Sequence, residues 1–249
     1  MTGKIQYTKR FGQVYLKNKE IAEFEADQIP GSFSNLLEIG AGEGFLTHIL
    51  LQRNFHVDAV EPDHRNVEIL SSLFSERISS GQLHIIKEDF LKLSPRSFDA
   101  IIGNIPYFIT APIIFQVIKY DFKEAVLMVQ KEFADKAAAL PGTEGAGRLT
   151  YSLNLRSSVK YLRTVPKSFF DPVPGVDSAI IKITPKPLHN TIPIEFADGV
   201  IRRLFSSRRK KIKTVYPNAP EKYGDRRAET LSMKEFMELC TSLHEITAL

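Results

Sequence analysis

The sequence of 249 residues contains a single cysteine, Cys240, and has no apolar run of the roughly 18 residues that a membrane-spanning helix needs. A lone cysteine excludes an internal disulfide and a cysteine-based zinc site, and we expect no bound metal. The first seven residues carry no apolar signal-peptide core. Hydrophobic residues make up 43% of the chain, which excludes long disorder. These features predict a folded cytoplasmic protein, which we expect to be a monomer.

Acidic side chains are absent from the first 19 residues, where five basic residues form a basic N-terminal segment. Residues 20–185 hold 16 basic and 21 acidic side chains, whereas 186–249 hold 12 basic and 8 acidic ones. Seven basic residues and no acid lie between Arg202 and Lys213. Positive charge gathered at the two ends favours a polyanionic partner, although a solvated helix face would have the same composition.

Short apolar runs alternate with segments of helical spacing along most of the chain. Strands are predicted at 36–39, 56–60, 83–87, 98–102, 125–129 and 177–184, and helices at 44–53, 63–76 and 111–119. This alternation predicts an α/β fold with a mostly parallel sheet and helices on both of its faces. Prolines interrupt 185–193, and helical spacing resumes at 195–215 and 232–246. We therefore predict a large domain at 1–186 and a small, basic, helical C-terminal domain at 187–249.

A glycine-rich turn follows the first predicted strand, with Gly40, Gly42 and Gly44 in the pattern Gly-x-Gly-x-Gly. The dinucleotide fingerprint has its third glycine one residue later. Glu61 ends the second strand, where a carboxylate can accept hydrogen bonds from both hydroxyls of a ribose. Asp89 follows the third strand, where it can accept from an adenine amino group. Turn or capping roles would explain either acid alone, whereas the three features together predict a nucleoside-binding site.

The fourth predicted strand ends in the sequence Asn104-Ile105-Pro106-Tyr107. The side-chain oxygen of Asn104 can accept a hydrogen bond from an exocyclic amino group, and Pro106 fixes the backbone so that the Ile105 carbonyl is a second acceptor. Tyr107 offers a flat face on which a base can stack. Two acceptors favour the pyramidal form of an aromatic amine, whose lone pair then points at an incoming methyl group. An ordinary strand-to-loop turn also uses Asn and Pro, so this function depends on the neighbouring nucleoside site.

The glycine turn with its two acids resembles the S-adenosylmethionine-dependent methyltransferases, which have a Rossmann-like fold. Nearly the whole chain further resembles the family of ribosomal RNA small-subunit adenine N6,N6-dimethyltransferases. The matching stretches are 10–16, 37–47, 104–112, 128–132, 147–149, 170–178, 205–210 and 227–229. The resemblance implies S-adenosyl-L-methionine as cofactor and the pre-small ribosomal subunit as partner. It implies that two adjacent adenosines near the 3′ end of small-subunit ribosomal RNA become N6,N6-dimethyladenosine late in ribosome assembly.

The resemblance also implies roles for individual residues. The expected cofactor-binding residues are Val14, Leu16, Gly40, Gly42, Glu61, Asp89 and Asn104. The expected catalytic residues are Asn104, Pro106, Tyr107 and Phe170, with Phe170 covering the second face of the target base. The RNA phosphates are expected to contact Arg208, Arg209 and Lys210, together with Lys9 and Arg10.

The chain departs from the family pattern at three positions. Val14 stands where Asn or His is usual, so only a backbone contact with the cofactor can be carried over there. Phe108 replaces a residue that is commonly polar, and Gly175 replaces a frequent lysine, which weakens an RNA contact at that point.

Other functions stay open on the sequence alone. DNA adenine and release-factor glutamine methyltransferases have a similar motif, but usually with proline where this chain has Ile105. An adenine N6-methyltransferase of large-subunit ribosomal RNA would need nearly the same site, and is the main alternative. A non-catalytic ribosome assembly factor would bind RNA without transferring a methyl group. The intact set of Gly40, Glu61, Asp89 and Asn104 argues against lost chemistry.

Overall fold

The computed structural model describes residues 14–187 and 192–247, which fall into two compact units. The first unit holds the chain up to Ala134 together with Lys160–Thr184, and the second holds Asp135–Val159 together with Pro185–Leu249. The sequence pattern places a boundary near residue 187, but the second unit also takes in 135–159. The reason is that Tyr151 and Leu155 are buried in the core of the helical unit.

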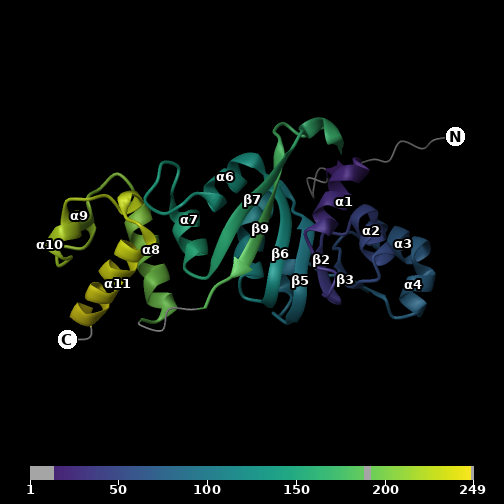
Figure 1. Cartoon of the computed structure of the whole chain (residues 1–249), viewed down its shortest axis with the longest axis horizontal. Helices are drawn as coiled ribbons and strands as arrows, with labels where there is room; N and C mark the ends of the chain where they lie inside the picture. Colours follow the sequence, from purple (N-terminus) through teal and green to yellow (C-terminus); the bar gives the residue numbers. More distant parts are fainter. Residues whose placement is uncertain (1–13, 188–191, 248–249) are drawn as a thin grey trace. The chain divides into compact units, whose positions relative to one another are not determined.

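A seven-stranded sheet forms the centre of the first unit, with the order β4-β3-β2-β5-β6-β9-β7 (Figure 1). Its strands are β2 (Asn35–Ile39), β3 (His56–Val60), β4 (Leu83–Ile86), β5 (Ser97–Asn104), β6 (Asp121–Gln130), β7 (Ser157–Val165) and β9 (Ser178–Pro185). Pairing is parallel from β4 through β6, and β9 runs antiparallel beside β6. The mostly parallel sheet is therefore confirmed, with all six predicted strands present, whereas β7 was not predicted.

Both faces of this sheet are covered, because consecutive residues of its central strands are buried. Leu36 and Leu37 on β2 are both fully buried, as are Ile101 and Ile102 on β5. Leu36 and Ile102 belong to a cluster that includes residues of the first three helices. The helices of this part are α1 (Lys19–Asp27), α2 (Phe45–Gln52), α3 (His64–Leu73), α4 (Ser75–Ser79) and α5 (Thr110–Val117), and α6 (Lys131–Ala138) begins in it and continues into the second unit.

A separate two-stranded pairing joins distant parts of the first unit. The short strand β1 (Tyr15–Leu16) runs antiparallel to β8 (Phe170–Asp171), with Leu16 opposite Phe170. The backbone N–H of Lys17 also donates to the carbonyl of Phe169, at 2.8 Å. The start of the described chain is thereby fixed beside the loop that precedes β9.

The second unit is helical, as the spacing after residue 195 predicts. Its helices are α7 (Arg148–Asn154), α8 (Ile194–Ser206), α9 (Ile212–Val215), α10 (Glu221–Gly224) and α11 (Met233–Thr247). Tyr151 and Phe236 are fully buried at its centre, with ring centroids 5.3 Å apart. None of the helices in the described parts of the chain has the length and apolar character that crossing a membrane requires.

Candidate active site

A cavity of about 630 Å³ lies at the carboxyl ends of β2, β3 and β5, within the first unit. Its volume is typical of sites that hold small ligands. Nine of the predicted site residues line it: Val14, Leu16, Gly40, Gly42, Glu61, Asn104, Pro106, Tyr107 and Phe170. The structure therefore brings the predicted nucleoside site and the predicted Asn-x-Pro-Tyr motif into one cavity.

The glycine turn is fixed to the end of the neighbouring strand. Gly42 has a φ of +56°, a conformation that residues with a Cβ rarely adopt. Its backbone N–H donates to Oε2 of Glu61 at 2.8 Å. A Cβ at Gly42 would also lie 3.2 Å from the ring of Tyr15. The turn is thus held in a tight conformation, with Gly40 and Gly42 lining the cavity.

Glu61 is buried at the end of β3 and uses both carboxylate oxygens within the protein. Oε2 accepts from Gly42, and Oε1 accepts from the backbone N–H of Asp63 at 2.8 Å. Burial raises the pKa of Glu61, while the hydrogen bonds from Asp63, Gly42 and Asn66 oppose that rise. A carboxylate has about four acceptor positions, so these three bonds leave capacity for one further donor such as a ribose hydroxyl. Glu61 therefore holds the turn and is also available to a ligand.

Asn104 is placed by a close approach of β5 to β2. A Cβ at Gly103 would lie only 2.3 Å from the carbonyl oxygen of Ile39, so only glycine allows these strands to come this close. The next residue, Asn104, consequently lies beside Gly40 and lines the cavity. Its amide is assigned with the nitrogen toward Glu25, because that orientation satisfies both amide atoms, and the nitrogen then donates to Oε1 and Oε2 of Glu25, at 3.0 and 3.2 Å. The amide oxygen is the atom left to accept a bond from a ligand.

The loop after Asn104 is fixed by bonds to its own backbone. The hydroxyl of Thr110 donates to the carbonyls of Pro106 and Tyr107, at 3.2 and 3.1 Å. The Tyr107 hydroxyl lies 2.5 Å from the hydroxyl of the buried Ser178. Phe170 belongs to the hydrophobic core and also lines the cavity. Two aromatic rings with restricted movement therefore border the cavity.

The structure adds cavity residues that the sequence reasoning missed. Tyr15, Glu38 and Asn66 line the cavity, and the Asn66 amide nitrogen lies 3.4 Å from the Tyr15 hydroxyl. Phe108, one of the departures from the family pattern, also lines it and is 61% exposed. In the sequence, the aromatic residue directly after Tyr107 is a signal for a further stacking surface.

Asp89 does not lie among the described residues that line the cavity. Its Oδ1 accepts from the backbone N–H of Leu91 at 3.0 Å and so caps the short helix Phe90–Lys92. The capping role considered for this acid is therefore present in the structure. A contact between Asp89 and an adenine amino group stays a prediction.

Glu38 is a second buried carboxyl group under the cavity, on β2. Burial raises its pKa to about 7, with a smaller contribution from the charge of Glu61, whereas a 2.6 Å hydrogen bond from the Thr47 hydroxyl opposes the rise. A carboxyl group whose pKa is higher in the fold than in the unfolded chain stabilises the fold fully below the unfolded pKa. That contribution is lost as the pH rises through the folded pKa.

We therefore expect the free energy of unfolding to fall by about 1.4 kcal/mol between about pH 6 and pH 8 through Glu38 alone. Glu38→Gln keeps an acceptor for Thr47 and cannot ionise, so its pH profile is expected to be flatter by this amount. Urea denaturation of both proteins across this range measures the difference, and titrating groups that do not interact with Glu38 contribute equally in both proteins. Parallel profiles would contradict the assignment of the raised pKa to Glu38.

The predicted RNA-binding residues that the structure describes lie in the second unit, after α8. Arg209 and Lys210 are exposed, and the Arg208 guanidinium donates to the carbonyl of Ala146 at 3.2 Å. Lys211 and Lys213 instead both pair with Asp225, at 2.7 and 2.9 Å. Part of the basic run is thus used within the protein. Lys9 and Arg10 lie outside the described residues.

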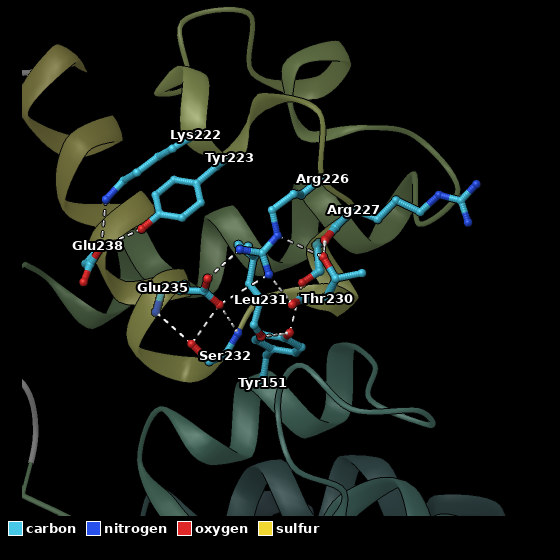
Figure 2. A network of polar contacts seen from close by, with 11 residues as sticks. Tyr151, Lys222, Tyr223, Arg226, Arg227, Thr230, Leu231, Ser232, Glu235 and Glu238 are labelled. Atoms are coloured by element: carbon cyan, nitrogen blue, oxygen red, sulfur yellow. Dashed lines mark hydrogen bonds and ion pairs between the residues drawn. The ribbon is translucent and has the colours of Figure 1, made fainter.

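A polar network in the same unit surrounds the Arg-Ala-Glu stretch (Figure 2). The Arg226 guanidinium binds Glu235, whose other oxygen accepts from the backbone N–H of Ser232 at 2.8 Å. The Tyr151 hydroxyl donates to the carbonyl of Ala228 at 2.9 Å. Arg227 is exposed and its side chain extends away from this network (Figure 2), so it is a further candidate for a phosphate contact. The described residues contain no group of three or more His, Cys, Asp or Glu placed to hold a metal ion.

Comparison with known proteins gives consistent results. A family model described as ribosomal RNA adenine dimethylase matches residues 5–243. A probable ribosomal RNA small subunit methyltransferase A from Methanospirillum hungatei is 33% identical over 88% of this chain and 86% of its own. The crystal structure of a dimethyladenosine transferase from Plasmodium falciparum has a TM-score of 0.80 at 28% identity, covering 94% of this chain and 97% of that one. The 23S rRNA methyltransferase ErmE has the same fold, with a TM-score of 0.73 at 24% identity over 92% of this chain and 99% of that one.

Proposed function

The chain belongs to the ribosomal RNA adenine dimethylase family, and we propose that it dimethylates N6 of two adjacent adenosines near the 3′ end of small-subunit ribosomal RNA. The methyl donor is S-adenosyl-L-methionine. We place the reaction on the pre-small ribosomal subunit in the cytoplasm, late in assembly, and we propose that the protein acts as a monomer. The observation that carries the proposal is the single cavity shared by the glycine turn, Glu61 and Asn104.

The residues of the cavity fit this cofactor. Glu61 supplies a buried carboxylate at a strand end for the ribose hydroxyls, and the tight turn around Gly42 lines the same cavity. Leu16 and Val14 border the same cavity, with Val14 offering its backbone. When bound, the cofactor supplies an electrophilic methyl group on a sulfonium centre.

The remaining residues hold the target base. Asn104 Oδ1 and the Ile105 carbonyl accept the two N–H groups of the unmethylated adenine amine, and one of them accepts the single N–H that remains before the second transfer. This directs the nitrogen lone pair out of the ring plane. The nitrogen is cationic and acidic after each transfer and releases its proton to water. Tyr107 and Phe170 hold the base between their rings, and base stacking contributes roughly 1–3 kcal/mol for each contact. A base must leave its stack to enter such a cavity, so the substrate adenosines are expected in a loop. Alignment is then the main catalytic contribution.

Methyl transfer to ribosomal subunits tests this proposal. Small and large subunits from cells that lack these modifications are each incubated with the protein and with cofactor labelled in its methyl group. We expect label in small-subunit ribosomal RNA only. Label in the large-subunit RNA would support the alternative methyltransferase, and cofactor binding without transfer to either would support the assembly-factor alternative.

The basic residues after α8 give a prediction about RNA affinity. Replacing Arg208, Arg209 and Lys210 with alanine should weaken binding to small subunits. The slope of log K against the logarithm of the salt concentration should become shallower by about 0.7–0.9 for each lost phosphate contact. The affinity for S-adenosylmethionine should stay unchanged, because the cofactor cavity is built from the first unit.

A matched control removes the same charge from exposed lysines of the first unit, Lys87, Lys92 and Lys119. A further variant, Arg209→Ala with Lys210→Ala, keeps the bond from Arg208 to Ala146 and separates RNA binding from local folding. Binding is measured at several salt concentrations. Wild-type affinity and slope in the triple variant would show that these residues only keep the surface soluble.

A further inference from the structure

A buried carboxyl group lies against the side chain that we propose holds the target amine. Glu25 is on α1 and is fully buried, and Asn104 ends β5. The carboxyl oxygens of Glu25 lie 3.0 and 3.2 Å from the Asn104 amide nitrogen. That atom is assigned as nitrogen because in the opposite orientation the amide oxygen would face only acceptors and the amide nitrogen only donors.

We infer that Glu25 is a positioning residue that fixes the Asn104 amide with its oxygen facing the target amine, an inference that rests on the proposed function. An asparagine amide can turn over about its last side-chain bond, and the turn exchanges the acceptor for a donor. A turned amide would present N–H groups to an amine that must itself donate. Glu25 prevents this by accepting an N–H of the amide, which keeps the amide nitrogen on the side of Glu25.

The cost of this carboxyl group argues against a purely structural role. The other buried residues of α1 are Ile21, Ala22 and Ala26, all of them apolar. No ion pair to Glu25 is present among the residues described, and the nearby carboxyl of Glu38 adds to burial in raising the pKa of Glu25. A buried carboxyl group without a cation destabilises a fold, and an apolar side chain of similar size is usually no worse there. The hydrogen bond to Asn104 is the interaction that a leucine would lack.

Glu25→Leu tests the inference by removing both acceptors while keeping the core filled. We expect kcat for methyl transfer to small subunits to fall about tenfold to a hundredfold, since small misplacements of reacting groups have effects of this size. Affinity for S-adenosylmethionine should stay within about threefold, and the urea midpoint should be equal or higher. Glu25→Gln retains one acceptor oxygen for the amide and should recover part of the lost rate.

A double-mutant cycle separates positioning from general structural damage. If Glu25 acts through Asn104, then Glu25→Leu should change the residual rate of Asn104→Ala by less than about twofold. Glu23→Leu, on the same helix but with its carboxyl group facing Lys19, is the matched control and should have wild-type activity. Equal losses from Glu25→Leu in both backgrounds, or wild-type activity in Glu25→Leu, would overturn the inference.

The side-chain amide of Asn104 gives a readout that needs no substrate. Its ¹⁵N–¹H signals are assigned by their absence in Asn104→Ala, and their hydrogen exchange is measured in the full chain. Slow exchange in the wild type and faster exchange in Glu25→Leu is the expected result. Equal exchange would overturn the inference whether or not the protein methylates RNA, whereas a wild-type protein that transfers no methyl group would contradict the proposed function alone.

Discussion

Asn104→Ala is expected to lower methyl transfer to small subunits by at least about a hundredfold, the range seen when a preorganised acceptor or donor at a reacting group is lost. The amide oxygen of Asn104 is the side-chain acceptor of the Asn-x-Pro-Tyr motif that we propose binds the target amine, since the Tyr107 hydroxyl already lies against that of Ser178. Affinity for S-adenosylmethionine should change by less than about tenfold, because the residue acts mainly on the amine. Single-turnover rates and calorimetric titration with the cofactor measure the two effects separately.

A control for this variant is Asn35→Ala, which makes the same substitution at the exposed start of β2. Asn35 is at the opposite end of its strand from the glycine turn, and it should have no effect on the rate. If Asn104→Ala turned over at the wild-type rate, Asn104 would be a residue of the strand-to-loop turn only. The assignment of the target-amine site would then be wrong.

Glu61→Ala is expected to weaken S-adenosylmethionine binding by roughly 1.5–3 kcal/mol, the usual contribution of a hydrogen bond to a charged group. Binding to small subunits should be nearly unchanged. The structure adds a second cause of the loss, because Glu61 also accepts from the N–H of Gly42 and so holds the glycine turn. Glu61→Gln retains one acceptor and should lose less affinity than Glu61→Ala.

Glu68→Ala is the matched control, since this acid is exposed on α3 and pairs with His64. Calorimetry of both variants with S-adenosylmethionine, beside subunit binding, gives the comparison. Wild-type cofactor affinity in Glu61→Ala would mean that this carboxylate only accepts hydrogen bonds from the backbone of Gly42 and Asp63 and does not contact the ligand.

The sequence predicted the strand ends well because the apolar runs and the residues after them are local signals. Gly40, Glu61 and Asn104 each follow a short buried strand, and the carboxyl ends of parallel strands meet at one edge of a sheet. The prediction that these three residues lie close together therefore required only the parallel sheet, and no other tertiary contact. The same reasoning failed to predict β7, whose residues Ser157–Val165 include exposed polar side chains and form no apolar run.

Features that depend on contacts between residues far apart in the chain could not be predicted from the sequence. Glu25 lies in an amphipathic helix, where an acidic residue is expected on the solvent-exposed face. Only the packing of α1 shows that Glu25 is buried and that its carboxyl group faces the Asn104 amide. Asp89 has the same local pattern as Glu61, but the structure uses it to cap a short helix. Tyr151 precedes the predicted boundary and yet belongs to the helical unit, because its partners Phe205 and Phe236 come late in the chain.

We propose that one cavity holds the methyl donor and positions its methyl group against N6 of each of two adjacent adenosines. Mass spectrometry of nuclease fragments from small-subunit ribosomal RNA, before and after incubation with the protein and S-adenosylmethionine, tests it most directly. We expect N6,N6-dimethyladenosine at two neighbouring positions near the 3′ end, and its loss with Asn104→Ala. Methylation at another atom or only elsewhere in the RNA, or full dimethylation by Asn104→Ala, would contradict it.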